Sequence, residues 1–119
     1  MQMEKSFDMS LLLDFYGGLL TEKQRQAMDM YVNQDFSLAE TAENMAISRQ
    51  AVLDLIQRSS DKLSSLEGQL GLLEKYKATL KQAGEIERLA AGTEAEAGLR
   101  AAAAHLRSIW DEDGEEHGI

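Results

Sequence analysis

Seven residues between Ser48 and Arg58 have the types and spacing to bind a nucleic acid. They lie in SLAETAENMAISRQAVLDLIQR, residues 37–58, which predicts two short helices joined by a tight turn. Serine and arginine can hold phosphate or guanine, and glutamine can bind adenine, when the N-terminal end of a helix enters the major groove. The candidate nucleic-acid-binding residues share the outer face of the second helix: Ser48, Arg49, Gln50, Leu53, Asp54, Gln57 and Arg58.

The segment around these residues has the pattern of a helix-turn-helix. That motif needs a small residue where the helices cross, which Ala42 provides, and a compact turn, which contains Ala46. Because Ala46 stands where glycine or asparagine is usual, the turn must avoid a positive φ there or accept strain. Thr41 replaces the usual bulky aliphatic residue, which weakens the anchor of the first helix. The second helix has the apolar anchors Ile47, Val52 and Leu55.

The same segment also has a purely structural interpretation. A helix-turn-helix is a common packing arrangement, and many such units never contact nucleic acid. Arg49 and Arg58 could equally be solvated surface charges, and Asp54 on the same face would repel phosphate. The net charge of −9 also opposes nucleic-acid binding, although residues 85–119 contribute −6 of it.

The composition predicts an all-α fold. The 119 residues contain no proline and are rich in alanine, leucine, glutamate and lysine, so most of the chain can be helical. We expect a helix-turn-helix domain with a long heptad-patterned helix over residues 1–84, and an acidic C-terminal extension with a further helix over residues 85–119. The absence of cysteine and of any long apolar segment predicts a cytoplasmic protein that does not bind membranes.

Three local signals predict where helices begin before residue 50. Thr21 with Gln24, and Ser37 with Glu40, have the spacing of capping boxes, and Ser48 can cap the helix that follows it. An earlier helix starts near residue 9 and ends near residue 16, before the Gly17-Gly18 pair. The helix-turn-helix is therefore expected to follow two other helices.

A leucine repeat continues beyond the helix-turn-helix. From Val52 onward, apolar residues recur at intervals of three and four, which predicts a long helix that Gly68 and Gly71 bend or interrupt. The stripe either folds back as a core or binds a second copy in a homodimer. We call its later leucines the leucine seam: Leu63, Leu66, Leu70, Leu73 and Leu80.

The C-terminal part contains weaker signals. Residues 83–93 include two glycines and little bulk, which predicts a hinge or a weak helix. Thr93 and Glu96 have capping-box spacing, so a last helix should start there and run to Trp110. The acidic segment at residues 111–119 is expected to be a solvated tail, or else an autoinhibitory segment that covers the recognition helix.

The stretch MSLLLDFYGGLLTEKQRQAMDMYVNQDFSLAETAENMAISRQAVLDLIQRSSDKLSSLEGQLGLLEKY, residues 9–76, resembles the YlxM family of bacterial helix-turn-helix proteins. The motifs DFYGGLLTEKQ and SRQAVLDLIQR make the resemblance specific. The resemblance implies a fold similar to sigma factor region four in an all-helical, often dimeric protein. It also implies a gene neighbourhood shared with the signal recognition particle GTPase, and an undefined role in that pathway with RNA or protein partners. The chain after residue 85 lies outside the resemblance.

No residue pattern of an enzyme or a metal protein is present in the sequence. There is no glycine-rich phosphate loop after a strand, no framed pair of carboxylates and no nucleophile beside a base. His105 and His117 are the only histidines, and neither has the spacing to share a metal with a second ligand. We therefore expect no catalytic activity, no cofactor and no bound metal.

Two functions are consistent with these features. The first is a DNA-binding regulatory protein, with RNA as the other nucleic acid to test, whose homodimer places two recognition helices. The alternative is a non-catalytic adaptor that binds and modulates the signal recognition particle GTPase or its RNA. The first predicts binding that weakens as salt rises, and the second predicts a protein partner that co-purifies.

Overall fold

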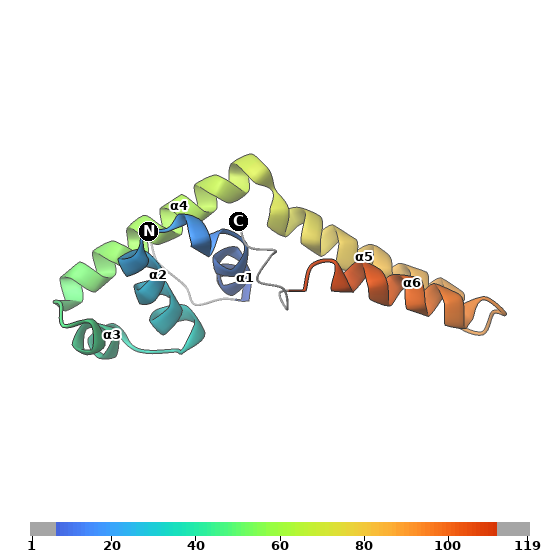
Figure 1. Ribbon diagram of the computed structural model, residues 1–119, viewed down its shortest axis with the longest axis horizontal. Coiled ribbons are helices and arrows are strands. Elements are labelled where there is room, and N and C mark those ends of the chain that lie inside the picture. The colour runs from blue at the N-terminus through green and yellow to red at the C-terminus, as the bar shows by residue number, and fades with distance from the viewer. Residues whose placement is uncertain (1–6, 112–119) are drawn as a thin grey trace. The chain divides into compact units, whose positions relative to one another are not determined.

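The computed structural model describes residues 7–111, which fall into two compact units, residues 7–71 and 72–111 (Figure 1). Every regular element within residues 7–111 is helical, so the predicted all-α class is confirmed. None of the helices described is long and apolar enough to span a membrane. The acidic residues and the histidine predicted to form a tail after residue 111 lie outside the described residues.

The first unit begins with two short helices that the local signals predict. Helix α1, Phe7–Tyr16, ends in the 3-10 turn Gly17–Leu19, and α2 follows at Glu22–Met28. The predicted capping box is confirmed, because the Gln24 backbone N–H donates to Thr21 Oγ1 at 3.2 Å and the Thr21 N–H donates to Gln24 Oε1 at 3.0 Å. A π-helical turn, Asp29–Asn33, then continues from α2 and ends this helical segment.

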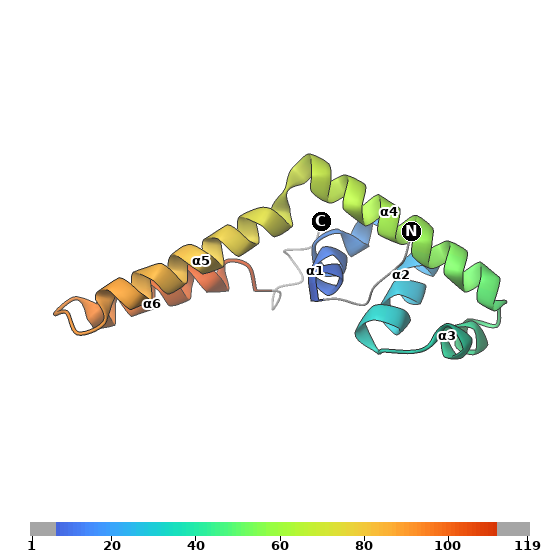
Figure 2. The ribbon, with the colours of Figure 1, turned by 180° about the vertical axis from the view of Figure 1, so that it is seen from behind.

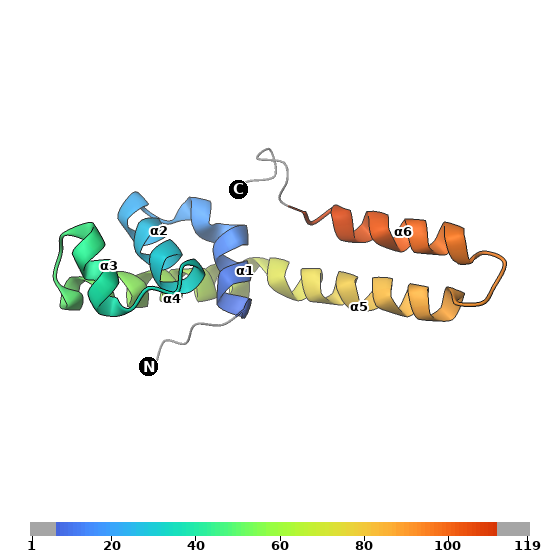
Figure 3. The same ribbon diagram turned by 90° about the horizontal axis from the view of Figure 1, so that it is seen from below.

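Helices α3, Leu38–Met45, and α4, Arg49–Leu70, form the helix-turn-helix. The second capping box is confirmed at Ser37 and Glu40, where the two hydrogen bonds measure 2.8 and 3.0 Å. In Figure 3, α1, α2 and α3 all lie along α4, and the contacts agree with that view. The long α4 is therefore the support on which the rest of the first unit packs.

The core of the first unit forms between α4 and the shorter helices. Tyr16, Met28, Val52 and Ile56 are fully buried, and Leu63 is buried with them. The Tyr16 hydroxyl donates to Glu67 Oε1 at 2.8 Å, which gives the polar end of this ring a partner on α4. Burying such large side chains supplies most of the stability available to a unit of this size.

Gly71 ends the long helix. Its backbone is left-handed, with φ 66° and ψ 28°, and its N–H donates to the Glu67 carbonyl oxygen at 2.8 Å. Glycine takes this conformation without steric cost, so α4 stops at Leu70 and a separate helix, α5, begins at Leu72. The predicted interruption near Gly71 is confirmed, whereas Gly68 is accommodated within α4.

The second unit is an antiparallel hairpin of α5, Leu72–Ala90, and α6, Glu96–Ser108 (Figure 2). Of the two alternatives for residues 83–93, the helix is correct for the first eight residues and the hinge is wrong, because α5 continues through them to Ala90. Packing of α5 against α6 outweighs the cost of about 1 kcal/mol for Gly84 in a helix interior. The expected domain boundary between residues 84 and 85 therefore falls inside α5.

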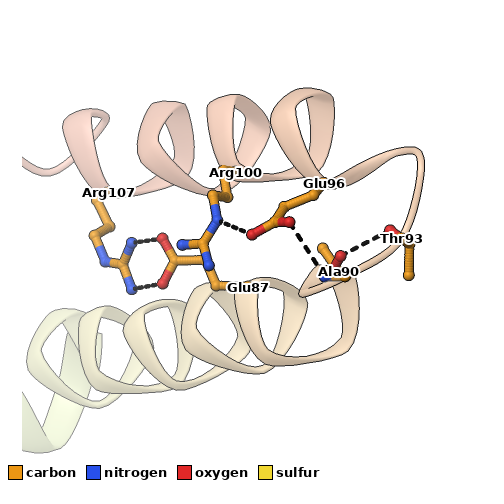
Figure 4. A network of polar contacts seen from close by, with 7 residues as sticks. Glu87, Ala90, Thr93, Glu96, Arg100 and Arg107 are labelled. Atoms are coloured by element: carbon orange, nitrogen blue, oxygen red, sulfur yellow. Dashed lines mark hydrogen bonds and ion pairs between the residues drawn. The ribbon is translucent and has the colours of Figure 1, made fainter.

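The loop between the two helices uses Thr93 and Glu96 differently from the prediction. No capping box forms there, since Ala95 is at the cap position and has no side-chain hydrogen bond. Instead, Thr93 Oγ1 donates to the Ala90 carbonyl at 2.7 Å, and the Gly92 N–H donates to Glu96 Oε1 at 3.1 Å. Both side chains close the hairpin loop (Figure 4).

A bidentate ion pair joins the two helices of the hairpin. The Arg107 Nη atoms donate to the Glu87 carboxylate oxygens at 2.5 and 2.9 Å, with Arg100 nearby (Figure 4). This hydrogen bond, supported by the positive charges of Arg107 and Arg100, holds the pKa of the Glu87 carboxyl below its ordinary value, although desolvation opposes the shift. The pair fixes the register of α6 against α5.

Candidate nucleic-acid interface

The joint between α3 and α4 has the geometry of a compact helix-turn-helix. Ala42 is buried on α3, and its carbonyl accepts from the Ile47 N–H at 3.1 Å. Ala46 adopts φ 59° and ψ 41°, so the turn accepts the left-handed conformation that glycine or asparagine takes more readily. Thr41 is fully buried, and its hydroxyl donates to the Ser37 carbonyl at 2.9 Å, which gives this polar replacement a partner.

The predicted binding residues lie on the side of α4 opposite to its buried residues. Leu53 is half-buried beside them, and the buried Val52 and Ile56 occupy the opposite side of the helix. The other six predicted binding residues are all exposed: Ser48, Arg49, Gln50, Asp54, Gln57 and Arg58. The structure therefore places these seven residues on one accessible surface, which we call the α4 face.

Ser48 prepares the N-terminal end of α4 at one edge of this surface. Its Oγ accepts the Ala51 backbone N–H at 3.0 Å, which makes it the helix cap that the sequence predicts. The first turn of α4 contains no acidic residue. The first turn of α4 therefore contributes no carboxylate that would offset the partial positive charge of the helix N-terminus.

The charges of the α4 face partly cancel. Arg58 Nε lies 2.9 Å from Asp54 Oδ2, in a pair whose side chains are 71% and 56% exposed. Exposed pairs of this kind contribute little to stability, so Arg58 can exchange Asp54 for another anion at small cost. Arg49 forms no ion pair within the part of the chain that the structure describes. The net charge of the face is +1.

The leucine seam is divided between the two units. Leu63 is fully buried in the first unit, while Leu66 beside it is half-buried and Leu70 is 47% exposed. Leu73 and Leu80 belong to the second unit, where the first is buried and the second half-buried. The left-handed Gly71 divides the seam, because a heptad stripe requires an uninterrupted helix.

The sequence patterns did not predict a cavity that the first unit contains. It has a volume of about 590 Å³ and lies between α1 and α2, beside the Gly17-Gly18 pair. Three carboxylates line it, Asp14, Glu22 and Asp29, together with one arginine, Arg25. The motif DFYGGLLTEKQ marks its position, but only tertiary packing shows that these side chains surround one hollow.

Comparison with known proteins extends the sequence resemblance. The family model described as "UPF0122: Putative helix-turn-helix protein, YlxM / p13 like" matches residues 3–99. The match includes both helices of the helix-turn-helix and all of α5, so the expectation that the resemblance stops before residue 85 is wrong. Much of the hairpin is thus part of the shared sequence pattern.

Individual relatives agree with this match. A UPF0122 protein of Clostridium kluyveri is 53% identical over 75 residues, which is 63% of this chain and 68% of the relative. One from Acetivibrio thermocellus is 46% identical over 84 residues, 71% of this chain and 72% of the relative. The UPF0122 protein YlxM of Bacillus subtilis is 42% identical over 96 residues, 81% of this chain and 87% of the relative.

Proposed function

Because the chain belongs to the UPF0122 family of YlxM / p13-like proteins, we propose that it is a regulatory protein that binds DNA through the α4 face. The observation that carries the proposal is the exposure of the polar residues at the N-terminal half of α4, directly after the turn at Ala46. In a helix-turn-helix this end of the second helix enters the major groove. Its free backbone N–H groups favour a phosphate.

The charge of the first unit sets the expected strength of binding. Residues 7–71 contain ten acidic and five basic side chains, so the α4 face is a weakly positive surface on a negative unit. Two arginines are available to neutralise phosphates. A plot of the logarithm of the association constant against the logarithm of the salt concentration should therefore have a slope of about −2 per copy. A homodimer would double this slope and place two α4 helices in successive grooves.

Removing the two arginines of this surface tests the proposal. We expect Arg49→Ala with Arg58→Ala to weaken binding about tenfold or more and to flatten the salt slope by about 2, because two phosphate or guanine contacts are lost. The measurement is fluorescence titration of labelled genomic DNA fragments, and of signal recognition particle RNA, at several salt concentrations.

A matched variant controls for net charge. Arg25→Ala with Arg88→Ala removes two exposed arginines that lie outside the α4 face, and it should bind as the unaltered chain does. Equal losses in both double variants would point to nonspecific attraction. Unchanged binding after removal of Arg49 and Arg58, or no binding by the unaltered chain, would refute the proposal.

The acidic cavity between α1 and α2 favours a second candidate function. Its three carboxylates against one arginine suit a cationic protein surface better than a nucleic acid. The corresponding function is a non-catalytic adaptor that docks on the signal recognition particle GTPase, alone or with its RNA, and modulates its activity. This candidate accounts for the net negative charge of residues 7–71.

Co-purification tests the adaptor. We expect the chain to retain the GTPase and alter its GTP hydrolysis, and we expect Asp14→Asn with Asp29→Asn to weaken both effects about tenfold, because two carboxylates of the cavity lose their charge. Asp61→Asn with Glu43→Gln is the matched control, since both side chains are exposed and outside the cavity. Absence of a complex, together with unchanged hydrolysis, would exclude this function.

A further inference from the structure

Asp54 is the acidic member of the α4 face, and it lies at the centre of that surface. It is two positions from both Val52 and Ile56, and at about 100° per residue this turns it roughly 160° away from each of these buried side chains. The Asp54 side chain is 56% exposed. A partner that covers the α4 face must therefore accommodate a carboxylate at its middle.

The distance along α4 places Asp54 where base edges would lie. The helix begins at Arg49, and Asp54 follows it at a distance of about 8 Å along the helix axis. The major groove is about 12 Å wide, and the N-terminal residues of a recognition helix lie against base edges there. Arg58 and Lys62 are both exposed and lie about 14 and 20 Å from Arg49, so they would meet the phosphates beyond the groove.

The Asp54 carboxylate differs from the other polar groups of the α4 face in what it can bind. A carboxylate only accepts hydrogen bonds, whereas the hydroxyl, amide and guanidinium groups of the other polar members can all donate them. It therefore cannot bind a phosphate, or the major-groove edges of guanine and thymine, which present acceptors but no donor. Only the amino groups of adenine and cytosine offer a donor in that groove.

In the free protein Arg58 supplies the donor. The Arg58 Nε atom donates to Asp54 Oδ2 at 2.9 Å, one helical turn away. When Arg58 turns to a phosphate, the carboxylate loses this partner at the moment that DNA covers it, and a buried acceptor without a donor costs free energy. An adenine or cytosine amino group at this point restores a hydrogen bond to Asp54, whereas guanine or thymine leaves the carboxylate unsatisfied.

We propose that Asp54 is a specificity-determining residue, which restricts tight binding to DNA with adenine or cytosine facing it on one strand. This inference rests on DNA binding by the α4 face, and it adds the class of site that the face selects. Each base pair has one amino group in the major groove, on its adenine or its cytosine, so the carboxylate distinguishes the two orientations of a pair. The negative charge weakens attraction to every sequence, and Asp54 thus lowers general affinity while it increases discrimination.

Site selection followed by titration tests this role. The full chain is mixed at low salt with duplexes that contain a random central segment, and the bound duplexes are enriched and sequenced. We expect one position to contain adenine or cytosine on a given strand. Exchanging the two bases of that pair between the strands should weaken binding about tenfold or more, which is the usual loss when one base pair of a site is wrong.

Removing the carboxylate should remove the preference. We expect Asp54→Ala to bind the two orientations of the pair with affinities within about twofold of each other, because no acceptor is left to be satisfied. Asp61→Ala is the matched control, since Asp61 is exposed about two turns further along the same side of α4 and has the same charge. Its removal should raise the affinity for both orientations alike and preserve the difference between them. Alanine favours helix, so both variants should retain their circular dichroism.

A third variant separates base recognition by Asp54 from an indirect role through its partner. Because Arg58 is assigned to a phosphate, Arg58→Ala should weaken binding to every duplex alike and leave the preferred orientation unchanged. A guanine preference that disappears in Arg58→Ala and in Asp54→Ala would mean that Asp54 only orients Arg58, and it would overturn the assignment.

Failure of this role can be distinguished from failure of DNA binding. If the unaltered chain binds no duplex, DNA binding by the α4 face and the role of Asp54 are both refuted. If the chain binds all duplexes equally well, only the role of Asp54 is refuted. The same holds if the preference survives in Asp54→Ala, or is lost to the same extent in Asp61→Ala.

Discussion

Replacing Leu63 with alanine is expected to lower the free energy of unfolding by about 2–5 kcal/mol. Leu63 is fully buried on α4, within the core that also contains Tyr16, Met28 and Ile56. Truncation removes buried methyl groups and leaves a cavity that the surrounding helices can fill only in part. Urea denaturation of the full chain, followed by far-ultraviolet circular dichroism, measures the change.

Leu70→Ala is the matched control, because Leu70 belongs to the same leucine seam but is 47% exposed. We expect it to change stability by no more than about 0.5 kcal/mol. The effect of Leu63→Ala should also be the same at low and high protein concentration, since its contacts lie within one chain. A concentration-dependent loss, or equal losses in the two variants, would instead place Leu63 in an interface between chains.

Local signals in the sequence predict the first unit well. The hydrogen bonds at Thr21, Ser37 and Ser48 depend on residues within three positions along the chain, so a short pattern contains all the information. The outward direction of the α4 face follows from the same reasoning, because the apolar anchors fix which side of the helix is buried. The Asp54–Arg58 pair has an i,i+4 spacing that would also have identified it.

The leucine seam shows what periodicity leaves undetermined. Spacing indicates that residues share a stripe, but it does not identify what covers them. Leu63 belongs to the first unit and Leu73 to the second, because one glycine with φ 66° separates the two helices. The interruption at Gly71 was predictable from a local preference against helix, but that preference does not tell whether the helix bends or ends there.

The hairpin and the acidic cavity depend on contacts that sequence patterns do not contain. Gly84 lies within α5 because Ala83 and Ala90 pack closely on α6, and this tertiary contact overrides the local propensity. Thr93 and Glu96 have the spacing of a capping box, yet the same side chains can close a loop. Similarly, Asp14 and Asp29 line one cavity only after α1 and α2 pack.

The turn at Ala46 gives the second large effect. We expect Ala46→Gly to raise the free energy of unfolding by about 1 kcal/mol, because a Cβ atom in the left-handed region costs roughly 1–2 kcal/mol that glycine avoids. Ala46→Val should lower the free energy by about 2 kcal/mol, since a β-branched residue is the least compatible with φ 59°. The measurement is again urea denaturation of the full chain.

Replacing a second alanine with glycine should change the free energy of unfolding in the opposite direction. This comparison distinguishes relief of backbone strain at Ala46 from a general effect of glycine. Ala101 is exposed within α6, where glycine should cost about 1 kcal/mol. If Ala46→Gly were destabilising as well, the left-handed turn would not be a source of strain.

Because the turn sets how α4 leaves α3, Ala46→Val should also weaken DNA binding, whereas Ala46→Gly should preserve it. A glycine variant that gains stability and keeps its affinity would mean that the strain at Ala46 is not required to present the α4 face.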